Sequence, residues 1–381
     1  MGCERLAPLT ATIRWPLVPM RAAIYWGKGD LRVEEVPVPE PGPGEMLVRV
    51  EACGICGTDI KKIEKGLLPG PRIFGHEICG TVARLGAGTQ RFREGDRVVV
   101  HHHVPCRRCF YCAQQAYAQC ESYKRNGTTA GFEAAGGGMA EYVKALDWIV
   151  ERGTIAVPDG VSPEEAALVE PVNTCLKAVR KAGVTRGQTV LVVGQGPIGL
   201  ILTQLCRGAG ADVLASDTMA DRLAMSRRLG AAAALDAAAV DVPKEVRALT
   251  GGRGADLAFM AAVGQAPFVQ AVDATRPAGR IIVFAATSPG ESVQVDLGAL
   301  CAAEKEILTS YSASVDVQDL AAQLVFGREV RVRELITHRF PLAEALRAVE
   351  VASRPAPGVL KVVLQEGEWL RTSSEVSSRA T

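Results

Sequence analysis

The chain has almost no excess charge: 43 lysine and arginine residues stand against 42 aspartate and glutamate residues. Without a basic field nothing draws in nucleic acid or an anionic membrane surface, so neither is expected as a partner. The chain also lacks an apolar run of the roughly 18 to 20 residues that a membrane-spanning helix needs. Residues 1–20 hold no sustained apolar core before a small-residue cleavage site, so no secretory signal is expected. These absences predict a cytoplasmic protein.

The length of the chain and the positions of its glycine and proline residues indicate two domains, with an extension at each end. At 381 residues the chain can form two units with separate cores. Strand-like patterning begins only after Met20 and the last residues are polar, so residues 1–20 and 366–381 are expected to be extensions. Between Met20 and about Pro171, short apolar runs broken by glycine and proline predict strands and turns, as in LRVEEVPVP, EMLVRVEACGI, GTVARLG, DRVVVHHH and MAEYVKA.

A glycine-rich turn follows this β-rich region, in the sequence VLVVGQGPIGL at 190–200. A G-x-G-x-x-G turn between a buried strand and a helix lets the backbone approach a pyrophosphate at the helix N-terminus. The same turn can serve close packing with no ligand, and the motif alone does not exclude that alternative. The residues expected to bind a dinucleotide are Gly194, Gly196, Pro197, Ile198 and Gly199.

The next apolar run, ADVLASD, ends in Asp217, 23 residues beyond Gly194. A carboxylate there accepts hydrogen bonds from the adenosine ribose and repels a 2′-phosphate, which favours NAD over NADP, although Arg222 nearby would qualify that preference. Further strands are expected at 231–237, 255–263, 280–286 and 306–312, and helices at 223–230, 243–249 and 267–274. This alternation predicts a doubly wound, Rossmann-type sheet of about six strands.

Eleven cysteines are many for a cytoplasmic chain, and seven of them fall between residues 53 and 120. Four of these thiols, spaced C-x2-C-x2-C-x7-C, can close a tetrahedron around one metal ion, and structural Zn²⁺ sites use such sets. Disulfides are the alternative, which a reducing compartment disfavours. The predicted structural zinc ligands are Cys106, Cys109, Cys112 and Cys120.

A second constellation is sparser: Cys56 lies in GICGTD, and His76 and Glu77 lie in FGHE. A thiolate, an imidazole and a carboxylate could hold a catalytic Zn²⁺ with one position left for water or substrate. A lone cysteine and histidine 20 residues apart are more often core residues. The nearby acids Asp59 and Glu170 favour the metal reading, because charged groups in apolar surroundings need a partner.

Taken together, these motifs resemble the zinc-containing medium-chain dehydrogenase/reductase family, in particular its sorbitol (L-iditol) dehydrogenase and threonine dehydrogenase branch. The resemblance spans about residues 21–365. Its carriers are GICGTD, GHE, the four-cysteine loop, Glu170–Pro171, GQGPIG and Asp217.

The resemblance implies a role for each residue of the second constellation. Cys56 and His76 match the first two catalytic zinc ligands. Glu77 matches the acid that is a direct ligand in sorbitol dehydrogenases and an alternating one elsewhere. Glu170 occupies the place of the third protein ligand, which is Cys in the classical alcohol dehydrogenases and Glu in the polyol and threonine branch. Asp59 matches the acid that orients the ligand histidine. Thr58 matches the hydroxyl that takes the substrate proton. The family would thus bind two zinc ions per chain, one catalytic and one structural.

The implied fold is α/β, with a discontinuous β-rich, GroES-like catalytic domain (21–172 and 313–365) and a doubly wound Rossmann coenzyme domain (173–312). The implied reaction is hydride transfer between a secondary alcohol of polyol or sugar type and NAD, with the ketone as the reverse substrate. Threonine, another amino-alcohol or a diol is the alternative substrate, and a non-catalytic zinc- and NAD-binding redox sensor is the alternative class. The family also implies a homodimer or homotetramer.

One position departs from the family pattern. Many members have CGTDxH, in which a histidine ends the proton relay, whereas this chain has Lys61 there, in CGTDIKK. An ammonium with its ordinary pKa of about 10.4 is a poor proton acceptor at neutral pH. The relay and its pH dependence are therefore in question. His101, His102 and His103 precede the four-cysteine loop, but a metal role for them is not favoured because that loop already holds four thiols.

Overall fold

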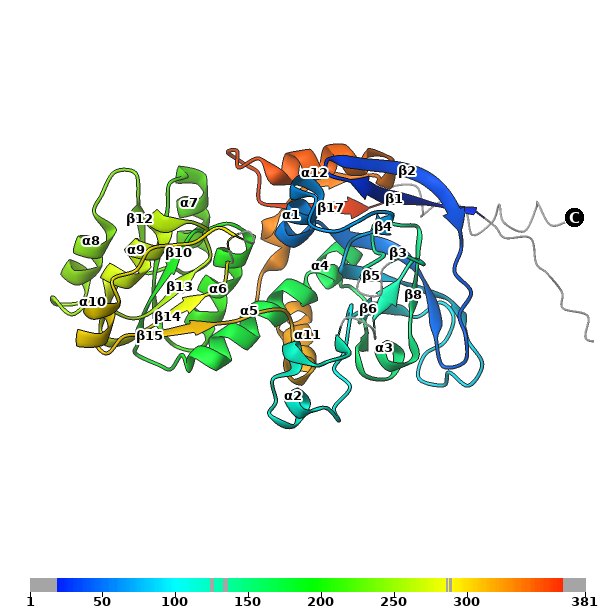
Figure 1. Cartoon of the computed structure of the whole chain (residues 1–381), viewed down its shortest axis with the longest axis horizontal. Helices are drawn as coiled ribbons and strands as arrows, with labels where there is room; N and C mark the ends of the chain where they lie inside the picture. Colours follow the sequence, from blue (N-terminus) through cyan, green and yellow to red (C-terminus); the bar gives the residue numbers. More distant parts are fainter. Residues whose placement is uncertain (1–18, 124–126, 133–135, 286, 288–289, 366–381) are drawn as a thin grey trace, which may run out of the picture.

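A computed structural model describes residues 19–123, 127–132, 136–285, 287 and 290–365. Figure 1 shows two sheet-containing lobes at opposite ends of the long axis, with helix α5 (Val169–Ala182) between them. The expected extensions lie outside the described residues, except that strand β1 already includes Pro19 and Met20. None of the helices in the described part is both long and apolar enough to cross a membrane.

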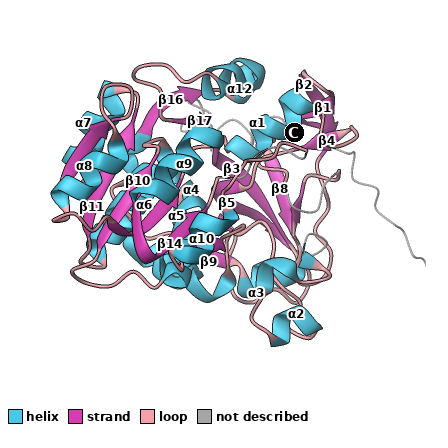
Figure 2. Ribbon diagram, turned by 60° about the vertical axis from the view of Figure 1, so that its left-hand side comes forward, coloured by secondary structure: helices cyan, strands magenta, loops and turns pink. Residues whose placement is uncertain are grey.

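One lobe is built on a parallel sheet of six strands in the order β12-β11-β10-β13-β14-β15. Its strands are β10 (Thr189–Val193), β11 (Asp212–Asp217), β12 (Ala233–Asp236), β13 (Ala255–Met260), β14 (Thr275–Val283) and β15 (Glu306–Thr309). Its helices are α6 (Pro197–Gly208), α7 (Ala220–Arg228), α8 (Val242–Leu249), α9 (Gln265–Ala274) and α10 (Leu297–Ala302). Figure 2 shows these helices around the strands. The predicted doubly wound Rossmann sheet is confirmed.

The element boundaries differ modestly from those expected. The strands expected at 255–263 and 306–312 end earlier, at Met260 and Thr309, and the helix expected at 223–230 begins at Ala220. Helix α10 was not expected from the sequence. Its six residues, LGALCA, are too short to display a helical period, and Asp296 caps it by accepting a hydrogen bond from the Ala299 N–H.

The other lobe is β-rich, as predicted, and contains a three-stranded and an eight-stranded sheet. Its strands are β1 (Pro19–Gly27), β2 (Asp30–Pro37), β3 (Met46–Gly54), β4 (Arg72–Ile73), β5 (Glu77–Leu85), β6 (Arg97–Val100), β7 (Thr128–Thr129), β8 (Tyr142–Ala145), β9 (Thr154–Ala156), β16 (Ile336–Phe340) and β17 (Lys361–Gln365). Its helices, with those that join the lobes, are α1 (Gly57–Lys65), α2 (Phe110–Ala113), α3 (Asp147–Arg152), α4 (Pro163–Ala167), α5, α11 (Gln318–Phe326) and α12 (Ala345–Ser353). Short 3-10 turns cover Tyr117–Gln119, Val315–Val317, Val332–Leu335 and Leu342–Glu344.

The C-terminal strand returns to the β-rich lobe after the chain has passed through the parallel sheet. Strand β17 lies between β16, to which it is parallel, and β3, to which it is antiparallel. This last strand therefore closes the β-rich sheet, and it pairs with the strand that leads to Cys56. The expected domain limits stay a prediction, and the limit at 172/173 falls inside helix α5.

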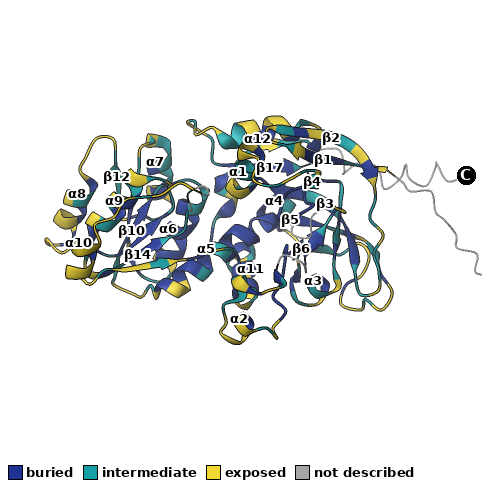
Figure 3. Cartoon of the chain, viewed as in Figure 1, coloured by how far each residue is buried: buried dark blue, intermediate teal, exposed yellow. Residues whose placement is uncertain are grey.

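A continuous apolar core joins the two lobes through helix α5. Buried residues of this core come from the β-rich sheet (Ala52 and Cys79), from α5 (Val172) and from the parallel sheet (Val190 and Val192). Figure 3 shows the buried segments of α4 and α5 in this central region. Because Glu170 lies in the first turn of α5, its carboxylate is placed near the junction of the lobes.

Candidate active site

Cys56, His76 and Glu77 are brought together by the pairing of β3 with β5. Gly54, the last residue of β3, pairs with Glu77, the first residue of β5, and Cys56 follows as the N-cap of α1. One ligand atom from each of the three side chains lies within 4.8 Å of the other two. A Cys, a His and a carboxylate at this separation can share one Zn²⁺ ion.

The cluster attracts positive charge. Asp59, on α1, is fully buried and its Oδ1 lies 3.3 Å from Nδ1 of His76. Burial lowers the pKa of His76, but the charges of Asp59 and Cys56 outweigh it and raise that pKa well above its usual value. Burial raises the pKa of Asp59, and the positive His76 lowers it overall. A divalent cation would satisfy the same field without a proton on the imidazole.

Glu77 has a cationic partner that sequence reasoning missed. Its Oε1 accepts a hydrogen bond from Lys361 Nζ at 2.6 Å, and both side chains are buried. Its Oε2 is buried and has no hydrogen-bond partner among the described residues. A Cβ on Gly54 would lie 1.9 Å from this Oε2, so glycine leaves the space that the carboxylate occupies. An orphaned carboxylate oxygen beside a thiolate and an imidazole fits a metal ion.

Glu170 lies outside the cluster that the other three side chains form. Its Oε1 is 3.4 Å from Thr174 Oγ1 and 3.8 Å from His102 Nδ1. Burial raises its pKa to about 7. The ring of His102 in turn lies 5.0 Å, centroid to centroid, from that of His76. His102 and Glu170 therefore form a polar wall beside the candidate metal ligands.

The three consecutive histidines follow strand β6 and are all buried. The His103 ring meets Tyr123 edge-on with centroids 3.5 Å apart, and Tyr123 OH donates to the carbonyl oxygen of Ala313 at 2.9 Å. Burial lowers the pKa of His101 to about 4. Burial also depresses the pKa of His102, so these two imidazoles are neutral at pH 7. They join none of the candidate metal clusters of the described residues.

Thr58 lies in the first turn of α1, and its Oγ1 is 3.3 Å from Cys56 Sγ. This contact places the predicted proton-accepting hydroxyl beside a candidate metal ligand. Lys61 lies one turn further along the same helix and is partly buried.

The four predicted structural ligands also come together. The Sγ atoms of Cys106, Cys109, Cys112 and Cys120 all lie within 4.8 Å of one another. The backbone N–H of Cys106 donates to Cys120 Sγ at 3.2 Å. The Arg108 N–H lowers the pKa of Cys106 to about 6, which favours the thiolate that a zinc ion needs. Four thiolates would fill a tetrahedral site and would leave no open coordination position.

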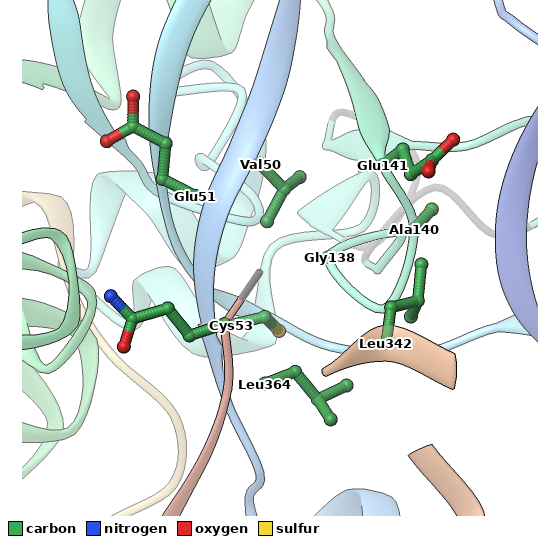
Figure 4. A pocket seen from close by; sticks show the side chains of 9 residues that line it. Val50, Glu51, Cys53, Gly138, Ala140, Glu141, Leu342 and Leu364 are labelled. Carbon is green, nitrogen blue, oxygen red and sulfur yellow. The ribbon is translucent and has the colours of Figure 1, made fainter. Parts of the chain in front are cut away.

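Four other cysteines are buried core residues. Burial raises the pKa values of Cys53, Cys79, Cys175 and Cys206, as expected for inert thiols in apolar surroundings. Figure 4 shows Cys53 among the side chains that line a small cavity beside β3, together with Val50 and Leu364. Since none of the candidate metal ligands lines this cavity, it is separate from the candidate active site.

The glycine-rich turn joins β10 to α6 as predicted. Gly194 has a φ of +90°, which favours glycine, and Gly196 is the N-cap of α6 with Pro197 in the first turn. A Cβ on Gly199 would lie 1.8 Å from the carbonyl oxygen of Gly194, so only glycine allows this close packing. Ile198 is partly buried and packs against the core that joins the lobes. If Gly196 carried a Cβ, the one non-neighbouring group within 4 Å of it among the described residues would be the guanidinium of Arg222.

Asp217 ends β11 beside this turn. Its Oδ2 accepts the Gln195 N–H at 2.6 Å and its Oδ1 accepts the Met219 N–H at 2.9 Å. Nη1 of Arg222 lies 4.0 Å from Asp217 Oδ2. The predicted cofactor residues therefore surround one helix N-terminus at the carboxyl ends of β10 and β11.

Comparisons with known proteins agree with this arrangement. Residues 42–158 match the family model described as the alcohol dehydrogenase GroES-like domain, and residues 197–326 match that described as zinc-binding dehydrogenase. Human sorbitol dehydrogenase is 31% identical over 336 residues, covering 86% of this chain and 91% of the human protein.

Two solved structures have the same fold. A zinc-binding dehydrogenase from Sinorhizobium meliloti 1021, bound to NADP, is 29% identical with a TM-score of 0.83, covering 92% of this chain and all of that one (100%). The 2R,3R-butanediol dehydrogenase of Bacillus subtilis is 26% identical with a TM-score of 0.79, covering 91% of this chain and 99% of that one.

The chain therefore belongs to the zinc-containing medium-chain dehydrogenase/reductase family, in its sorbitol dehydrogenase-like branch. It is a zinc-dependent oxidoreductase of alcohols that uses a nicotinamide cofactor, and these predictions from the sequence are confirmed.

Proposed function

We propose that the protein oxidises a secondary alcohol of polyol type with NAD, at a zinc site formed by Cys56, His76 and Glu77. The observation that carries this proposal is the convergence of these three side chains within 4.8 Å. The polar wall of His102 and Glu170 supports a hydroxylated substrate, because it would offer hydrogen bonds that an apolar alcohol cannot use.

The roles of the residues follow from their placement. Zinc bound here would act as a Lewis acid on the substrate oxygen, and NAD would accept the hydride. Asp59 holds the tautomer of His76 that leaves its other ring nitrogen for the metal. Thr58 accepts the substrate hydroxyl proton at Oγ1 and passes its own proton on. Glu170 is kept as a neighbouring acid, because it lies beside His102 and outside the ligand cluster.

A second zinc ion is proposed at Cys106, Cys109, Cys112 and Cys120, with a structural role. Support comes from the closed tetrad of thiols and from the small core that these cysteines share with Tyr123. The ion would hold the loop that also carries the contact between Tyr123 and Ala313.

NAD is proposed as the preferred cofactor. The Asp217 carboxylate lies where the adenosine ribose is expected, and it would repel a 2′-phosphate. The Sinorhizobium meliloti relative is bound to NADP, so cofactor choice varies among similar proteins. Arg222, close to Asp217, is the residue here that would assist a phosphate.

The division into a discontinuous catalytic domain (21–172 and 313–365) and a coenzyme domain (173–312) is also proposed. It is supported by the return of β17 to β3. We further propose that two copies associate through β15, which ends the parallel sheet and carries the exposed side chain of Ile307. Light scattering on wild type and on Ile307→Lys would test this, and an unchanged molar mass would reject the interface.

The function is tested by NADH formation on a panel of polyols, diols, threonine and simple alcohols, with NADP⁺ in parallel. Cys56→Ser and His76→Ala should abolish turnover while the fold and NAD binding persist. Turnover on threonine alone would favour the amino-alcohol alternative. If the zinc-loaded protein forms no NADH with any substrate of the panel, a non-catalytic redox sensor is favoured. Full activity of either variant would remove the catalytic zinc assignment.

A further inference from the structure

Lys361 places a buried ammonium against the candidate metal centre. It begins strand β17, and its side chain is only 7% exposed. Its Nζ donates to Glu77 Oε1 at 2.6 Å and to the carbonyl oxygen of Ile55 at 2.9 Å. These two bonds fix the ammonium between the start of β5 and the turn that carries Cys56.

The Glu77 carboxylate is thereby divided between two partners. Oε1 is engaged by Lys361, whereas the buried Oε2 lacks a hydrogen-bond partner among the described residues. The side chain has little freedom to turn, because it is 1% exposed and fills the space left by the missing Cβ of Gly54. Only Oε2 is therefore left without a partner among the described residues.

The number of Glu77 oxygens that bind the metal ion decides whether a coordination position stays free for the substrate. Zn²⁺ takes four ligands in most protein sites, and a catalytic site needs one of them to be exchangeable. A carboxylate that binds through both oxygens would occupy the exchangeable position. Lys361 also adds a positive charge to a set in which the Cys56 thiolate and Glu77 otherwise neutralise a divalent ion, which makes the metal a stronger Lewis acid.

We propose that Lys361 is a positioning residue that limits Glu77 to one metal-binding oxygen and so keeps a coordination position free for the substrate oxygen. This inference rests on the proposed zinc site at Cys56, His76 and Glu77. It assigns a task to the C-terminal strand, which lies 284 residues beyond Glu77 in the sequence.

The test is the visible absorption of the Co²⁺-substituted protein, which weakens when tetrahedral cobalt gains a fifth ligand. The signal of the four-cysteine loop is subtracted with Cys56→Ser. Lys361→Met should weaken the remaining band at least about twofold and lower kcat about 10- to 100-fold, with zinc bound at least as tightly as in wild type. Lys361→Arg should restore the band.

The matched control is Lys144→Met, which removes a lysine paired with Glu45 at 3.0 Å at the far end of β3. It should leave the cobalt band unchanged. An unchanged band in Lys361→Met, or loss of zinc that Lys361→Arg does not rescue, would overturn the proposal.

A second comparison, in a Glu77→Gln background, covers the case in which Lys361→Met leaves Glu77 as an uncompensated charge and prevents folding. There, adding Lys361→Met should change the cobalt band no further, because Lys361 acts through the carboxylate. A further change would overturn the inference. Absence of zinc from the Cys56 site of the wild-type protein would instead reject the proposed function itself.

Discussion

Replacing Asp217 with alanine should reverse the cofactor preference. The carboxylate is 7% exposed and accepts two backbone N–H groups of the turn that faces the cofactor. Loss of one charge-assisted hydrogen bond to the ribose costs about 1.5–3 kcal/mol, or roughly 10- to 150-fold in kcat/KM for NAD.

The expected rise in kcat/KM for NADP comes from the loss of repulsion between the Asp217 carboxylate and the 2′-phosphate. Two unit charges about 4 Å apart in a water-like environment repel by about 1 kcal/mol, and a 2′-phosphate carries close to two. Removing Asp217 therefore relieves about 1.5–2 kcal/mol, and Arg222, 4.0 Å from the carboxylate, becomes available to the phosphate. The ratio of kcat/KM values should move toward NADP by between about 100-fold and a few thousand-fold.

The assay is steady-state kinetics with both cofactors and one alcohol substrate, at low and at physiological salt. Salt should reduce the gain for NADP, because dissolved ions screen the charge of the 2′-phosphate. Asp212→Ala is the control, since it removes an exposed carboxylate from the other end of β11 and should leave the ratio unchanged. A shift below about tenfold in Asp217→Ala would refute the reasoning.

Three more outcomes are expected. Cys112→Ser should remove about one zinc per chain, measured by metal analysis, and lower the melting temperature; unchanged zinc content would contradict a four-thiol site. Gly54→Ala should cost about 3–5 kcal/mol, measured by chemical unfolding, because its Cβ would displace Glu77 from Lys361. Burial raises the pKa of Asp256, but Arg276 at 2.7 Å and the Thr189 N–H lower it overall. The resulting stability is present above the unfolded pKa of about 3.9 and is lost as pH falls through the folded value. Asp256→Asn should thus destabilise by about 1 kcal/mol at pH 7 and less at pH 4, and an equal loss at both would reject the ion pair.

Local patterns in the sequence were sufficient for much of the fold. The turn from β10 into α6 was predicted because Gly194 and Gly199 are required by backbone geometry at fixed spacing. The four-cysteine loop could be predicted equally well, since its four candidate ligands lie within 15 residues. Helix α10 was not, because six residues display no period and capping by Asp296 is a weak signal.

The surroundings of the candidate metal site were harder to predict than its ligands. Lys361 is a single charged residue at the start of an apolar strand, and only the pairing of β17 with β3 places it beside Glu77. Glu170 was assigned through family resemblance, and its role as a zinc ligand stays a prediction. Its carboxylate lies 3.8 Å from His102 Nδ1 and is not one of the three groups that lie within 4.8 Å of one another, and no sequence spacing encodes such separations.

The residues at the candidate metal site come from distant parts of the chain, and this separation affects folding. Cys56, Glu77 and Lys361 belong to three strands or their ends, and Lys361 arrives only after the parallel sheet has been completed in the chain. Until β17 pairs with β3, the Glu77 carboxylate would be buried without its cation, which is costly in an apolar environment. A metal ion bound at the cluster would compensate that charge in the same way. Because either cation compensates the same carboxylate, zinc should stabilise the fold at least as strongly in Lys361→Met as in wild type, in line with its at least equally tight binding there.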